Sequence, residues 1–166
     1  MLGTVRRLRD EQAPLPAGLF IASPWADLTL SGDTGITLAD ADITLSMESI
    51  RAAANAYAAP EDRVNPYVSP VFADYSQPIP PTLIQAGTRE LALSDAVRLY
   101  QAIRIAGQMA VLDVYEGMPH IHQTLLPSAA ETNWRLWARA PHKRQTPGVL
   151  HAGGFRFWNY GCGSRI

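Results

Sequence analysis

Three short apolar runs, separated by helix-length segments, constrain the fold of this chain more than any other feature. They are residues 17–25 (AGLFIASPW), 82–86 (TLIQA) and 109–115 (MAVLDVY). Each run is too short for a core helix and is bounded by proline, glycine or charge, which is typical of buried strands. Strands separated by helices are joined by parallel crossover connections. The sequence therefore predicts an α/β fold, with a mostly parallel sheet flanked by helices.

Helices are predicted over three further segments, which are residues 2–12, 44–58 and 94–106, and in the last two apolar side chains recur with a helical period. Thr44 or Ser46 can supply the N-cap of the second segment. Ser94 is predicted to cap the third, and Gly107 suits the position just after its end. Residues 27–42 show no clear period and are predicted to be a loop. Six prolines predict a connector without regular structure over 59–81.

The pattern predicts one domain over residues 1–140, in which residues 27–80 form a helical and loop excursion from the sheet. After about residue 131 the periodicity fails, so residues 141–166 are predicted to form an irregular, poorly ordered tail. The length of 166 residues suits a single domain of this kind.

Charge and cysteine content exclude several classes of function. The net charge of −1 argues against nucleic acid as a partner, because phosphate binding requires a clustered basic surface. No apolar run approaches the roughly 20 residues of a membrane span. Cys162 is the only cysteine, which excludes an intrachain disulfide and a cysteine-based metal site. These features favour a reducing, cytoplasmic compartment.

Polar residues follow the second and third predicted strands at the ends where chemistry collects in parallel sheets. Glu90 and Asp95 follow one strand, and His120 follows the other in the stretch YEGMPHIHQ. An acid and a histidine at neighbouring strand ends form the base-and-orienter half of a nucleophile–His–acid relay. His122 lies two residues further on, but no third ligand at a usable spacing supports a metal site.

Four segments in order, AGLFIASPWADLTLSGDT, NPYVSPVFADY, PPTLIQAGTRELALSDAVRLYQAIRIAG and VLDVYEGMPHIHQ, resemble the C-terminal half of an α/β-hydrolase of the hormone-sensitive-lipase family. The resemblance covers residues 5–131. It implies a partial α/β-hydrolase fold, a serine carboxylesterase or lipase activity on small acyl esters, and no cofactor. It also implies that His120 is the catalytic base and that Glu90 is the triad acid, with Asp95 as the nearest competitor.

The other half of such an active site is missing from the sequence. No G-x-S-x-G elbow is present, and no H-G-G-type loop that would supply the oxyanion hole. We therefore expect the chain to be truncated and inactive on its own. Two alternatives stay open: a non-catalytic fragment or interaction module that self-associates through an exposed sheet edge, and a peptidase of the same fold. Trp25 is expected either to line an acyl pocket or to pack in the core.

Overall fold

The computed structural model describes residues 2–125, so the predicted tail at 141–166 lies outside the described residues. In chain order the elements are α1 (Leu2–Asp10), β1 (Leu19–Ala22), α2 (Thr34–Thr37), α3 (Met47–Tyr57), the 3-10 turns η1 (Pro60–Asp62) and η2 (Pro70–Phe72), β2 (Thr82–Arg89), α4 (Leu93–Ile105), β3 (Ala110–Pro119) and α5 (His122–Leu125).

The three strands form a parallel sheet in the order β1-β2-β3, which confirms the predicted fold class. The register pairs Ile21 of β1 with Ile84 of β2, and Ile84 with Leu112 of β3. β2 lies in the centre, and its residues 82–87 are all buried. Burial on both faces explains why this strand is a nearly continuous apolar run rather than an alternating one.

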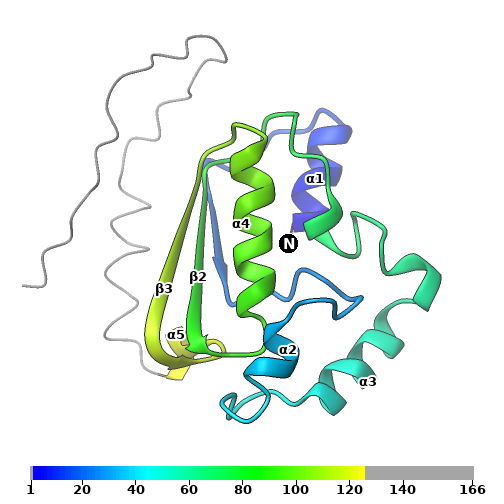
Figure 1. The fold of residues 1–166 in the computed structure, drawn as a ribbon. Helices are drawn as coiled ribbons and strands as arrows, with labels where there is room; N and C mark the ends of the chain where they lie inside the picture. The colour runs from blue at the N-terminus through cyan, green and yellow to red at the C-terminus, as the bar shows by residue number, and fades with distance from the viewer. Residues whose placement is uncertain (1, 126–166) are drawn as a thin grey trace, which may run out of the picture.

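Helix α4 covers one face of the sheet and forms the core with it (Figure 1). Ile84 and Ala86 of β2 share a buried cluster with Leu99 and Ile103 of α4, and α1 contributes Val5. Full burial of a leucine or isoleucine side chain contributes about 1.5–3 kcal/mol. Within residues 2–125, no helix is long and apolar enough to cross a lipid bilayer.

Two strands extend further than the sequence predicts. β2 continues to Arg89 rather than ending at residue 86, and β3 continues to Pro119 rather than ending at Tyr115. The glycine-containing ends of both runs were predicted to be loops because glycine disfavours strands. Cross-strand pairing keeps these ends extended as far as the pair Arg89 and Pro119. The next residues, Glu90 and His120, directly follow the two strands.

The excursion between β1 and β2 contains α2, α3 and the two 3-10 turns. Ser46 and Ser49 cap α3 reciprocally, as a capping box. The predictions of a loop over 27–42 and of an irregular connector over 59–81 are wrong where α2, η1 and η2 form. Helix α4 begins at Leu93 without a side-chain cap, so the predicted cap by Ser94 is also wrong.

Candidate active site

Glu90 and His120 lie side by side where β2 and β3 end. The register that pairs Arg89 with Pro119 places the following residues of both strands next to each other. His120 Nδ1 lies 2.9 Å from Glu90 Oε2, and the Glu90 side chain is fully buried. The other carboxylate oxygen of Glu90 accepts the backbone N–H of Gly87 at 2.9 Å. One oxygen thus fixes the carboxylate while the other faces the imidazole.

A bulge near the end of β3 directs His120 toward this carboxylate. The strand register shifts between Gly87 and Arg89 of β2. Gly117 of β3 has a φ of +71°, and its N–H donates to the Thr88 hydroxyl at 2.7 Å. Bulges bend a strand and re-aim the side chains beyond them. Gly117 supplies the backbone conformation that this bend requires.

Asp95 lies on the first turn of α4 and holds the loop that follows β1. Its Oδ2 atom accepts the backbone N–H groups of Ala26 and Asp27, at 2.8 and 2.9 Å. Although Asp95 lies at the start of α4, it does not cap this helix, which has no side-chain cap hydrogen bond. Burial raises the pKa of Asp95 to about 6, although the two N–H donors act in the opposite direction. The carboxylate that meets His120 is therefore that of Glu90.

Asp27 organises the same loop from within. One of its carboxylate oxygens accepts the Thr29 N–H at 2.8 Å, and the other accepts the Ser31 hydroxyl at 2.6 Å and Arg98 Nη1 at 2.7 Å. Burial opposes ionisation, but hydrogen bonds from Ser31, Thr29 and Arg98 outweigh it and lower the pKa of Asp27. The Trp25 indole N–H donates to the Asp27 carbonyl oxygen at 3.1 Å. The loop is therefore a fixed support for Trp25.

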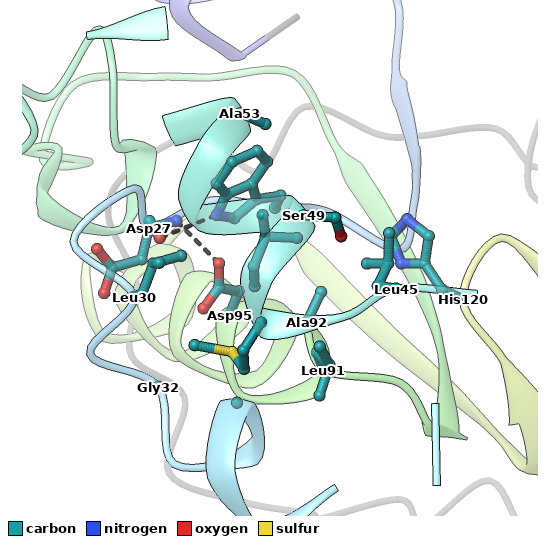
Figure 2. A pocket seen from close by; sticks show the side chains of 14 residues that line it. Asp27, Leu30, Gly32, Leu45, Ser49, Ala53, Leu91, Ala92, Asp95 and His120 are labelled. Carbon is teal, nitrogen blue, oxygen red and sulfur yellow. Dashed lines mark hydrogen bonds between the residues drawn. The ribbon is translucent and has the colours of Figure 1, made fainter. Parts of the chain in front are cut away.

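A pocket of about 300 Å³ lies beside His120 (Figure 2). Its wall comes from the loop after β1, from α3 and the residues before it, and from the start of α4. The apolar lining includes Trp25, Leu30, Leu45, Met47, Ile50 and Leu91. Figure 2 shows His120 beside Leu45 on one side of the pocket, with Asp27 and Asp95 on the other. Apolar walls with a few placed polar groups are typical of small-molecule sites, so a nonpolar group fits next to the imidazole.

His122 is separate from this pair and packs inside the protein. Its side chain is fully buried, and its ring centroid lies 4.9 Å from that of Tyr115. Burial lowers the pKa of His122, while the charge of Glu90 acts in the opposite direction. In the part of the chain that the structure describes, no group of three or more His, Cys, Asp or Glu side chains is placed to hold a metal ion.

The sequence did not point to Ser23, which lies beside His120. The Ser23 hydroxyl accepts the backbone N–H of Ile121 at 3.0 Å. The available signal is its position directly after β1, at the sheet edge where Glu90 and His120 also lie. Cys162 lies outside the described residues.

Known protein families match most of the described chain. Residues 1–124 match the model of a family described as having the alpha/beta hydrolase fold. The chain belongs to the α/β-hydrolase family. This α/β-hydrolase is 35% identical over 120 residues to an acetyl-hydrolase from Streptomyces hygroscopicus, a match that covers 72% of the chain and 40% of the relative. It is 33% identical over 113 residues to an esterase from Acinetobacter venetianus, which covers 68% of the chain and 37% of the relative.

Solved structures resemble the α/β-hydrolase over a similar range. A hormone-sensitive lipase from a metagenome library is 32% identical with a TM-score of 0.75, covering 84% of this chain and 50% of that one. An esterase of the bacterial hormone-sensitive lipase family is also 32% identical, with a TM-score of 0.73, covering 81% and 45%. The chain thus spans half or less of the length of these relatives.

Proposed function

We propose that the chain carries the acid and the base of a serine carboxylesterase that hydrolyses small acyl esters. The observation that carries this proposal is the contact of 2.9 Å between a buried carboxylate and the His120 imidazole, next to an apolar pocket. Similarity to an acetyl-hydrolase and an esterase supports the same class of substrate.

In this mechanism the Nδ1–H of His120 donates a hydrogen bond to Glu90. The other ring nitrogen, Nε2, is then unprotonated and can accept a proton. Nε2 removes the proton of a serine hydroxyl as that oxygen attacks the ester carbonyl, and then returns it to the leaving alcohol. Glu90 holds the tautomer and stabilises the imidazolium without taking the proton itself. Water then repeats the sequence and releases the acid. A nonpolar part of the ester occupies the pocket beside the imidazole.

The nucleophile and the oxyanion hole come, in this proposal, from a segment outside residues 1–166. None of the serines in the sequence lies in a G-x-S-x-G context. The purified chain should therefore not hydrolyse p-nitrophenyl butyrate above the buffer rate, because most of the rate enhancement has no source without those groups.

A chimera tests the proposal directly. The part of the Streptomyces hygroscopicus acetyl-hydrolase that precedes the matched region is fused to this chain, and p-nitrophenyl butyrate turnover is measured. The folded chimera should be active, and His120→Ala should abolish its activity. Glu90→Gln should lower kcat by about 10³–10⁴-fold, as loss of an orienting acid does, whereas the control Glu116→Gln, on exposed β3 surface, should not.

Three outcomes would count against the proposal. The first is turnover by the chain alone that depends on His120. The second is a folded chimera that is indifferent to Glu90→Gln. The third is a greater loss of kcat on Asp95→Asn than on Glu90→Gln, which would make Asp95 the acid.

A further inference from the structure

Two residues that border the Glu90–His120 pair have a backbone conformation that is unusual for their type. Ser23, directly after β1, has a φ of +46°, and Ile121, directly after His120, has a φ of +48°. Non-glycine residues adopt this left-handed region only at a cost, and a β-branched isoleucine does so rarely. Such strain persists where surrounding contacts impose it, and it clusters at functional sites.

A hydrogen bond joins these two residues to each other. The Ile121 N–H donates to Ser23 Oγ at 3.0 Å. Ser23 itself is 4% exposed, and its own N–H donates to the carbonyl oxygen of Gln85 in β2 at 2.7 Å. Ser23 therefore connects three strand ends: it extends β1, is anchored to β2, and holds the backbone that follows β3.

The placement of this bond decides how His120 is held. The side chain of His120 contacts Glu90 through Nδ1. The main chain of His120 is held at the next peptide unit, whose N–H donates to the Ser23 hydroxyl. The Ile121 N–H belongs to the peptide that joins it to His120, so this bond fixes that peptide relative to β1. Without the bond the peptide can rotate, and compensating rotations about the backbone of His120 would move the imidazole.

We propose that Ser23 is a positioning residue for His120: its hydroxyl holds Ile121 in the left-handed conformation and thereby keeps the imidazole against Glu90. This inference rests on the proposed function, in which His120 is the catalytic base. Serine suits the position because it combines a small side chain with an acceptor oxygen. Alanine keeps the strain at residue 23 and loses the acceptor, whereas glycine removes the strain and also loses the acceptor.

The test uses the purified 166-residue chain and does not require catalysis. Proton NMR detects the His120 Nδ1–H that is hydrogen-bonded to Glu90, and His120→Ala and Glu90→Gln identify its resonance. Its exchange rate with water is measured in Ser23→Ala and Ser23→Gly, together with the urea midpoint of each variant. Ser69→Ala is the matched control, because Ser69 is also a fully buried serine whose hydroxyl accepts a backbone N–H, that of Leu28 at 2.8 Å.

Both Ser23 variants should accelerate exchange of the His120 proton by at least about fivefold, the shift expected for loss of one ordinary hydrogen bond. Ser23→Gly should nevertheless unfold at a higher urea concentration than Ser23→Ala, so that exchange does not follow stability. The control should lower the urea midpoint and leave the exchange rate unchanged.

Unchanged exchange in both Ser23 variants would overturn the positioning role alone. Equal acceleration in Ser69→Ala would also overturn it, because the effect would then follow general stability. A wild-type chain without a resonance that depends on both His120 and Glu90 would instead overturn the proposed acid–base pair, and this inference with it.

Discussion

Replacing Asp95 by asparagine should raise the free energy of unfolding above pH 6. The Asp95 side chain is 5% exposed, and one of its oxygens accepts two backbone N–H groups. Burial raises its pKa to about 6 from an ordinary value of 3.8, and the nearby charge of Asp27 raises it further, while the two N–H donors and the charge of Arg98 act against the shift. The charged form is thus disfavoured in the folded protein.

The sign and size of the effect follow from proton linkage. Between pH 4 and pH 6 the folded chain keeps a proton that the unfolded chain releases, so stability is full below this window and falls as the pH rises through it. A shift of about 2 pKa units corresponds to about 3 kcal/mol. Asparagine carries no charge and can present its amide oxygen to the same two N–H groups. Asp95→Asn should therefore remove the contribution of this carboxyl to the slope and gain up to about 3 kcal/mol at pH 7.5.

Urea unfolding, followed by circular dichroism from pH 4.5 to pH 8, measures this effect. Asp33→Asn, at an exposed position, serves as the control and should keep the wild-type slope. Asp95→Ala should be less stable than Asp95→Asn by about 1–3 kcal/mol at every pH, because it leaves buried N–H groups without an acceptor. The reasoning fails if Asp95→Asn keeps the wild-type slope, or if it is less stable than wild type at pH 7.5.

Three further substitutions test how the elements around the site are held. Ser46→Ala removes the N-cap of α3 and should lower the protection of its amides in hydrogen exchange by about 1 kcal/mol. Ser49→Ala removes the bonds of its own hydroxyl to the Ser46 backbone but keeps Ser46 as the acceptor of the Ser49 N–H, so it should lower the protection less; equal effects would contradict the cap assignment. Gly87→Ala should lower the free energy of unfolding by about 2 kcal/mol or more, because the new Cβ would overlap the Met118 carbonyl oxygen of β3; an unchanged urea midpoint would refute the close approach of the two strands.

Much of the architecture follows from the sequence because local patterns and burial agree. The central strand and helix α4 are predicted from apolar runs and helical spacing, and Gly107, with a φ of +78°, occupies the predicted position after α4. The sequence predicts ends that are too early for both strands, because Gly87 and Gly117 weaken the local strand signal. There the pairing between β2 and β3, a long-range effect, determines the conformation.

In the candidate site, too, local sequence predicts some features, whereas others depend on contacts between distant residues. His120 and two acids, Glu90 and Asp95, are the candidates because of their positions after consecutive strands, which are local information, and the family resemblance favours Glu90. The partners of Asp95 are 69 and 68 residues away, and Ile121 is 98 residues from Ser23. Spacing in the sequence does not encode hydrogen bonds of this kind, so it predicts neither the bonds of Asp95 to the loop after β1 nor the bond of Ser23 to Ile121. Trp25 lines the pocket, one of the two positions expected for it.

The contact between Glu90 and His120 is made within one strand–helix–strand unit, β2–α4–β3. Genetic exchange between relatives with crossover points outside this unit would transmit Glu90 and His120 together, with their mutual spacing intact. Ser23 directly follows β1, which precedes this unit. A crossover in the excursion between β1 and β2 would therefore combine Ser23 and its surroundings from one parent with His120 from the other. Recombinants of that kind should inherit the pair itself but differ in how firmly the imidazole is held.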